Sequence, residues 1–145
     1  MKSLPVSFYV QRYSDYFNTT GTPILFDRER LNVGGTMSLT SGKFTAPRAG
    51  TYAFSFTGNA YLPASSSRVV LYVHMYLNGS WVASGYADEV SSYGQYETLS
   101  FQSTLNLKVG DQIWLQIYSI SAGAYLSGNY LTQFSGYLLD ETLPQ

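Results

Sequence analysis

The sequence predicts an all-β fold, and three observations support this. First, apolar and polar residues alternate with a period of two in several segments, as they do in strands with one buried and one solvated face. Second, Asn78-Gly79 lies between two such segments and favours a tight hairpin turn, because both residues tolerate positive φ. Third, no stretch combines helical periodicity with capping residues. A sandwich or barrel of short strands is therefore expected.

Four segments carry the alternation, and each is expected to form a strand: residues 52–56, 69–77, 98–107 and 113–117. In the second of these, aliphatic residues occupy the odd positions, while Tyr72, His74 and Tyr76 share the even positions. Three stretches rich in Ser, Gly and Tyr are expected to be loops: residues 64–67, 84–96 and 119–130. Turn signals at intervals of about ten residues are typical of β-sandwiches and barrels.

The composition favours one globular domain. The chain has 145 residues, 45% of them hydrophobic and 17% aromatic, with 14 Tyr, which is enough to form a substantial core. The net charge is −1, so nothing attracts nucleic acid or an anionic membrane. The longest apolar stretch, residues 69–77, is too short to cross a bilayer. Residues 1–5 are expected to be a flexible start, or one added for expression.

Residues for catalysis are missing from the sequence. There is no Cys, so a catalytic thiol, a disulfide or a thiolate metal site is excluded. His74 is the single His, and it is interpreted as a packed or interface residue in mid-strand. Neither a G-x-S-x-G elbow nor a Walker loop occurs, and the adjacent carboxylates of Asp88 and Glu89 would point to opposite faces of a strand. We therefore expect no enzymatic activity.

A spacing of aromatic residues resembles a known family. Seven residues stand in the pattern F-x5-N-x11-F-x5-G-x-Y-x-F-x-F: Phe26, Asn32, Phe44, Gly50, Tyr52, Phe54 and Phe56. This resembles the signature of the complement C1q globular-head family. Residues 6–8 and 107–115 resemble that family's opening and penultimate strands, and residues 134–139, which include Phe134 and Gly136, resemble its closing strand. Met37 replaces the usual aromatic or Leu residue, which keeps an apolar side chain.

The resemblance implies a jelly-roll β-sandwich of about ten antiparallel strands that forms a tight homotrimer outside the cell. Some relatives carry calcium near the trimer axis, and Glu97 occupies a position comparable to one of their acidic residues. However, Ser127-Gly128-Asn129 lacks the acidic run of those relatives, so no cofactor is expected and calcium is the minor alternative. Asn18 and Asn78 begin possible glycosylation sequons, of which Asn18 is the better candidate.

The expected function is recognition by a lectin-like or pattern-recognition head that binds carbohydrate or microbial-surface ligands. Five residues are the candidate ligand-binding set: Arg68, Tyr86, Asp88, Tyr93 and Tyr96. Tyr rings can stack on sugar faces while polar side chains bond hydroxyl groups, and loops on a rigid scaffold usually carry such sites. Under the alternative interpretation these tyrosines pack between subunits. The other functions considered are a trimeric ligand for a cell-surface receptor and the structural head of a collagen-like protein.

Overall fold

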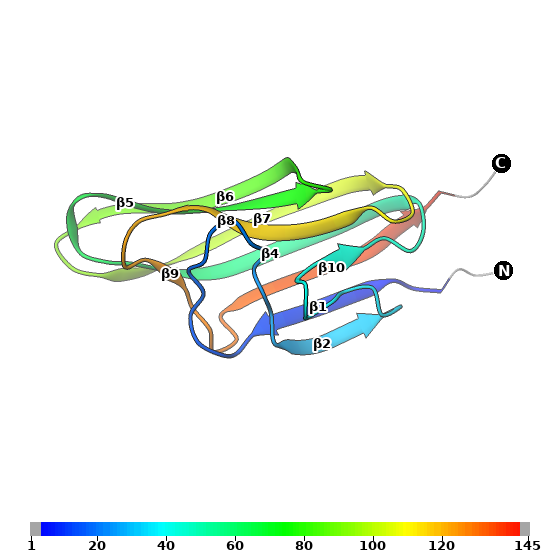
Figure 1. Cartoon of the computed structure of the whole chain (residues 1–145), viewed down its shortest axis with the longest axis horizontal. Coiled ribbons are helices and arrows are strands. Elements are labelled where there is room, and N and C mark those ends of the chain that lie inside the picture. The colour runs from blue at the N-terminus through cyan, green and yellow to red at the C-terminus, as the bar shows by residue number, and fades with distance from the viewer. Residues whose placement is uncertain (1–3, 143–145) are drawn as a thin grey trace.

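The computed structural model describes residues 4–142 and confirms the all-β prediction, because this part of the chain contains strands, turns and loops but no helix. The ten strands are β1 (Ser7–Arg12), β2 (Arg28–Val33), β3 (Phe44–Thr45), β4 (Gly50–Leu62), β5 (Ser65–Leu77), β6 (Ser80–Ser91), β7 (Gln95–Leu107), β8 (Gln112–Ile120), β9 (Tyr125–Leu126) and β10 (Thr132–Glu141). The start of β1 and the end of β10 lie at the same end of the molecule (Figure 1).

The strands form two antiparallel sheets that pack face to face as a jelly roll. The larger sheet has the order β2-β1-β10-β4-β7, with β9 also paired to β4, and the smaller sheet has the order β3-β8-β5-β6. Within β4 every second residue from Gly50 to Leu62 is buried, as a strand with one face on the core requires. Consequently each sheet has a second face that points away from the core.

The predicted hairpin turn is confirmed. Asn78 and Gly79 connect β5 to β6 with φ values of 51° and 92°. The Asn78 side chain also makes two hydrogen bonds: its Nδ2 donates to Asp111 Oδ1 at 2.9 Å, and its Oδ1 accepts from the Gln112 backbone N–H at 2.8 Å. The same residue therefore sets the turn and ties it to the start of β8.

The family-motif aromatic residues form the centre of the core. Phe44, Tyr52, Phe56 and Phe134 are almost completely buried, and Phe26 and Phe54 retain only 2% exposure. The ring of Phe54 contacts four others, with centroid distances between 5.5 and 6.3 Å. Such offset and edge-to-face packing adds to the stabilisation from burial. The aromatic residues of the motif therefore fill the space between the two sheets.

Each of the three polar or small residues of the motif is needed at its position for a different structural reason. Asn32 fixes the turn after β2, since its side chain bonds both the N–H and the C=O of Met37. At Gly136 a Cβ atom would lie 2.6 Å from the Phe8 ring and 2.7 Å from the Phe54 ring, so only Gly lets these aromatic rings pack against the strand. Gly50 begins β4, and a Cβ there would lie 2.5 Å from the Asp140 carbonyl oxygen.

The prediction of a loop at residues 84–96 is wrong. Most of this stretch belongs to β6 and β7, and only residues 92–94 form the turn between them. Tyr residues favour strands. Most of the Ser and Gly residues of this stretch lie on strands that are partly exposed to solvent, so a composition typical of loops occurs here in strands. Likewise β5 already begins at Ser65, and β9 lies inside the expected loop 119–130.

Of the expected flexible start, residues 1–3 lie outside the described part of the chain, while Leu4 and Pro5 are exposed and belong to no strand. Within residues 4–142 there is no helix that could cross a membrane.

Candidate functional site

The structure brings three of the five predicted binding residues together and separates the other two. Arg68 on β5 and Asp88 on β6 form an ion pair, and Tyr86 lies two residues before Asp88 on the same strand face. All three are on the outward face of the four-stranded sheet. Tyr93 lies in the turn between β6 and β7, and Tyr96 points outward from the six-stranded sheet. The predicted set is therefore not one site.

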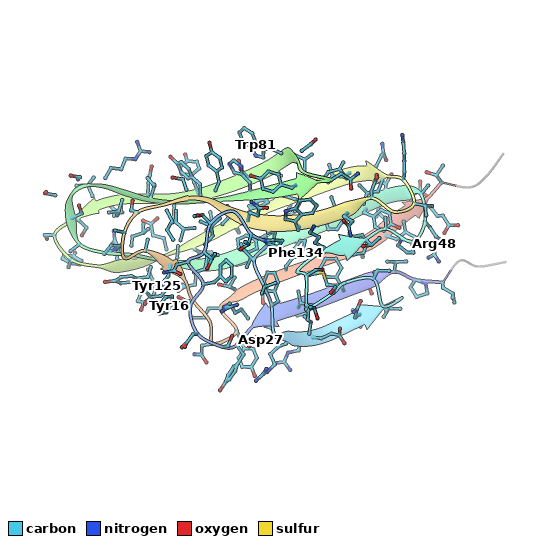
Figure 2. The ribbon with its side chains drawn as sticks, in the orientation of Figure 1. Tyr16, Asp27, Arg48, Trp81, Tyr125 and Phe134 are labelled. Atoms are coloured by element: carbon cyan, nitrogen blue, oxygen red, sulfur yellow. The ribbon has the colours of Figure 1, made fainter. Side chains whose placement is uncertain are left out.

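An aromatic groove adjoins the cluster of Arg68, Tyr86 and Asp88. This outer-face groove has a volume of about 370 Å³ and is lined by Tyr72, His74, Tyr76, Trp81, Ser84, Gly85, Tyr86 and Tyr118. These residues come from β5, β6 and β8, which are neighbours in the small sheet. None of the lining residues is an Asp, Glu, Lys or Arg. Figure 2 shows Trp81 projecting from this side of the sandwich, away from Tyr16 and Tyr125 on the other side.

The centre of the outer-face groove is a stack of three rings. His74 lies between Trp81 and Tyr118, with centroid distances of 4.4 and 4.2 Å and interplanar angles of 4° and 9°. The pairing of β5 shifts register near both partners, between Met75 and Tyr76 toward β6 and between Tyr72 and Val73 toward β8. Such bulges re-aim side chains, which is how rings from three strands come to be stacked.

Further rings extend the aromatic surface on either side of the stack. Tyr72 and Tyr86 pack edge to face at 5.4 Å, next to the Arg68–Asp88 pair. Beyond the other side, the Tyr76 ring lies 6.0 Å from that of Trp114. Three rings of the groove are the most accessible, since Trp81 and Tyr86 are each 62% exposed and Tyr118 is 60% exposed. A ligand can therefore reach them without any rearrangement of the sheet.

The groove is electrically neutral at pH 7. Burial lowers the pKa of His74, so its ring is uncharged, and its Nδ1 lies 3.2 Å from the Tyr76 hydroxyl. At the edge of the groove the hydrogen bond and negative charge of Asp88 raise the pKa of Arg68. Because these two charges compensate each other, the surroundings of the groove carry little net charge.

A second and larger hollow lies on the opposite side of the sandwich. This tyrosine hollow, of about 700 Å³, is lined by Tyr13, Ser14, Asp15, Tyr16, Asn59, Tyr96, Tyr125, Ser127, Gly128, Asn129 and Leu131. The Tyr125 ring lies 4.7 Å from that of Tyr16 and 5.0 Å from that of Tyr61. Contact between the hydroxyls of Tyr96 and Tyr125, 3.2 Å apart, raises the pKa of Tyr125 to about 12.

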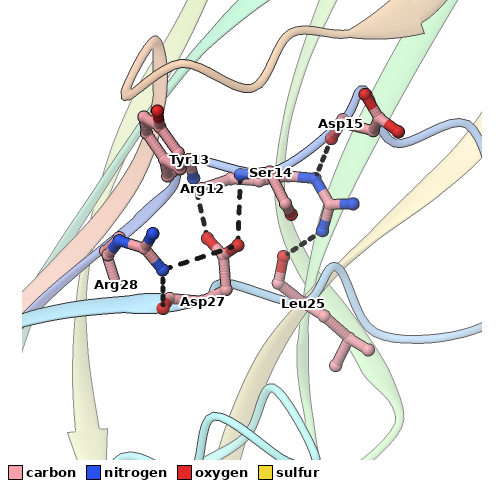
Figure 3. Close-up of polar contacts among 7 residues, drawn as sticks. All are labelled: Arg12, Tyr13, Ser14, Asp15, Leu25, Asp27 and Arg28. Carbon is pink, nitrogen blue, oxygen red and sulfur yellow. Dashed lines mark hydrogen bonds and ion pairs between the residues drawn. The ribbon is translucent and has the colours of Figure 1, made fainter.

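Asp27 holds one wall of the tyrosine hollow (Figure 3). Its carboxylate accepts hydrogen bonds from the backbone N–H groups of Tyr13 at 2.7 Å and Ser14 at 3.1 Å. Partial burial acts to raise the pKa of Asp27, but these bonds and the Arg28 charge outweigh it, so the pKa lies below its usual value. Arg12 completes the support by donating to the Asp15 carbonyl at 2.7 Å.

The facing wall is a strained loop. Asn129 and Tyr130 both have positive φ, at 56° and 68°, which is uncommon for a bulky residue. Their backbone N–H groups donate to the carbonyls of Tyr13 and Arg12, and these bonds hold the strained conformation. A side chain at Gly128 would collide with the Ser14 carbonyl, so only Gly fits there.

Glu97 does not gather a set of metal ligands. Burial raises its pKa, and the neighbouring Glu89 and Asp88 carboxylates add to the effect. Glu97 and Tyr96 point to opposite faces of β7, so Glu97 faces away from the hollow that contains Ser127 and Asn129. Residues 4–142 contain no group of three or more His, Asp or Glu side chains that could hold a metal ion. The expectation of no cofactor, with calcium as the minor alternative, stays a prediction.

Of the eight residues that line the groove, the predicted binding set contained only Tyr86. It missed the aromatic residues Tyr72, His74, Tyr76, Trp81 and Tyr118, and also Ser84 and Gly85. The even-numbered aromatics of residues 69–77 were a usable signal, because they share one face of a strand. The sequence interpretation instead placed such strand residues in the sandwich or against neighbouring subunits. The register shifts that bring Trp81 and Tyr118 onto His74 have no sequence signature.

Comparison with known proteins identifies similar chains. A family profile described as the C1q domain matches residues 7–139. Caprin-2 of Danio rerio is 31% identical over 140 residues, and complement C1q tumor necrosis factor-related protein 3 of Homo sapiens is 28% identical over 136 residues. These matches cover 96% and 92% of this chain, but only 14% and 51% of the relatives. The chain thus spans about half or less of their length.

Two solved structures share the fold. The globular domain of zebrafish complement 1qA protein superimposes with a TM-score of 0.69 at 20% identity, covering 94% of this chain and 99% of that one. The Eiger TNF of S. frugiperda gives a TM-score of 0.74 at 10% identity, covering 98% and 97%. At these identities the likeness concerns the fold alone.

Proposed function

The chain belongs to the C1q domain family, and we propose that it is a non-enzymatic, homotrimeric recognition head that binds carbohydrate through the outer-face groove. The observation that carries the proposal is the uncharged groove of Tyr, Trp and His rings. Aromatic faces next to hydroxyl groups are suited to sugars, which present apolar C–H faces and polar edges. The proposal keeps the extracellular location predicted from the sequence.

The large sheet offers a surface for self-association. The side chains of β4 and β7 that point away from the core are all uncharged: Thr51, Ala53, Ser55, Thr57, Asn59, Tyr61, Tyr96, Thr98, Ser100, Gln102, Thr104 and Asn106. Near a threefold axis each side chain faces its own copies, so charged residues would repel one another there. Low charge and exposed Tyr are also typical of the centres of protein interfaces.

An assembly through the large sheet leaves the small sheet facing solvent. Each trimer would then carry three outer-face grooves, and several weak contacts could hold a repetitive surface by avidity. In this arrangement Tyr86, Arg68 and Asp88 act at the ligand site, because they lie on the exposed sheet. Tyr96 acts in assembly, because it lies on the uncharged face. Tyr93, which is 70% exposed in the β6–β7 turn, stays a candidate for ligand contact.

The absence of enzymatic activity belongs to the same proposal. A general base needs a nitrogen that a substrate can reach, whereas His74 is only 7% exposed and its Nδ1 lies 3.2 Å from the Tyr76 hydroxyl. No second His or Cys is present to act with it. Binding is expected without calcium, since the groove contains no carboxylate to hold a cation.

A trimeric ligand for a receptor is the second candidate function. The tyrosine hollow favours it where the hollow extends beyond the β4–β7 face toward Tyr13, Asp15 and Tyr16, because a large and partly polar hollow suits a protein surface better than a small ligand. In that case mutations of Tyr16 or Tyr125 would abolish binding, while mutations of the groove would not.

The direct test is an array of neutral and charged glycans probed with purified protein, with and without calcium. The proposal expects binding to neutral glycans that Trp81→Ala and Tyr86→Ala each weaken. Val109→Ala is a matched control, because Val109 is 68% exposed in the turn before β8 and lines neither hollow. If the control variant loses binding as well, or if neither ring variant does, the groove is not the site.

A further inference from the structure

The accessible rings of the outer-face groove fall into two separate groups. Tyr86 packs on Tyr72 in one group, and Trp81 and Tyr118 flank His74 in the other. Trp81 and Tyr86 lie five residues apart on β6. At a rise of about 3.3 Å per residue this places their Cα atoms roughly 15 Å apart. One pyranose ring is similar in size to one aromatic ring, so it cannot stack on both Trp81 and Tyr86.

We propose that the groove contains at least two sugar subsites and that its ligand is an extended, uncharged oligosaccharide of two or more pyranose units. The first subsite is the Tyr72–Tyr86 pair, and the second is the stack of Trp81, His74 and Tyr118. This inference rests on the proposed function and names the ligand class for the same groove.

The charges around the groove favour a neutral chain. The lining contains no charged side chain, and Arg68 at its edge is paired with Asp88. On the other side, beyond Tyr76, the Lys43 Nζ lies 4.3 Å from the centroid of the Trp114 ring, so this cation is engaged with an aromatic ring. A sulfated or carboxylated sugar would therefore lose part of its hydration without gaining an unpaired partner inside the groove.

The backbone beneath the groove argues against a peptide as the ligand. β5, which carries Tyr72 and His74 in the middle of the floor, is paired with β6 on one side and with β8 on the other, so a peptide lying along the groove would meet no free strand edge. The free edge of the small sheet is on the far side of β6. What the floor offers is rigid rings. Trp81 is fixed by its stack and by the bond from Nε1 to the Ala83 carbonyl at 3.1 Å. Pre-organised rings bind a repeating ligand at low entropic cost.

The test is isothermal titration calorimetry with soluble oligosaccharides of one to six units, in neutral glucose, mannose and N-acetylglucosamine series. Soluble ligands with one chain each remove avidity from the result. Affinity in the series that binds should rise about three- to tenfold from the single sugar to the length that fills both subsites, and then level off. Tyr86→Ala and Trp81→Ala should each abolish this rise, while the ring-retaining variants Tyr86→Phe and Trp81→Phe should keep it.

The outcomes separate the inference from the proposed function. Binding that is equally tight for a single sugar and its longer oligomers overturns the two subsites but leaves carbohydrate recognition intact. A length dependence that persists in both Ala variants places the subsites elsewhere and also overturns the inference. If no sugar of any series binds at any length, the proposed function fails and the inference fails with it.

Discussion

Replacing Phe54 by Ala tests how the core holds the two sheets together. Phe54 is 2% exposed and packs on Phe8, Phe44, Tyr52 and Phe134. A buried Phe→Ala change costs about 3–5 kcal/mol, through lost burial and the cavity that remains. For a chain of this size each kcal/mol lowers Tm by about 2–4 °C, so the expected drop is about 6–20 °C.

The assay is guanidinium unfolding of both proteins at one fixed concentration, because the stability of an oligomer depends on protomer concentration. Phe54→Leu is the matched control: it keeps most of the apolar volume and should cost less than about 1.5 kcal/mol. A loss below about 1 kcal/mol for Phe54→Ala would refute the reasoning, since it would mean that the ring contributes little to the core.

Three further predictions concern assembly, pH dependence and the hairpin turn. Tyr96→Ala should shift the protein toward monomers in sedimentation velocity while its groove still binds soluble glycan; an intact trimer with lost binding would instead make Tyr96 a ligand residue. Because burial lowers the pKa of His74 in the folded state, the unfolded state binds more protons below pH 6.5. The free energy of unfolding should therefore fall as pH drops from 7 toward 5, and it should fall less for the His74→Phe variant than for the wild-type protein. The same dependence of unfolding free energy on pH in both proteins would contradict this. Gly79→Ala should cost about 1 kcal/mol or more in thermal unfolding because φ is 92° there, whereas an unchanged Tm would show that the turn tolerates a side chain.

Much of the fold could be predicted from local patterns. Alternation identified parts of β4, β5, β7 and β8, Asn78-Gly79 identified a hairpin, and the spacing of aromatics such as Phe44 and Tyr52 identified the core. Turns depend on residues that are close in the sequence, and burial of one strand face produces an alternating pattern of apolar residues, so both can be recognised in the sequence. The assignment of residues 84–96 to a loop failed because edge strands can carry Ser, Gly and Tyr on their solvent side.

The candidate site was predictable only in part, because it depends on contacts between strands. Arg68 and Asp88 meet because β6 continues beside β5 beyond residue 84, where the sequence predicted a loop. Trp81 and Tyr118 reach His74 only through shifts in register on both sides of β5. Tyr96 was grouped with Tyr86 because the two are close in the chain, yet the strands that carry them belong to different sheets.

The measurement that most directly tests the central claim is glycan-array binding by wild-type protein and the double variant Trp81→Ala/Tyr86→Ala, compared at equal concentration and equal oligomeric state. Both changed side chains are 62% exposed, so the double variant is expected to fold and assemble normally. We predict that the wild-type protein binds neutral glycans and that the double variant does not. A folded double variant that binds the same glycans as strongly as the wild-type protein would contradict the claim.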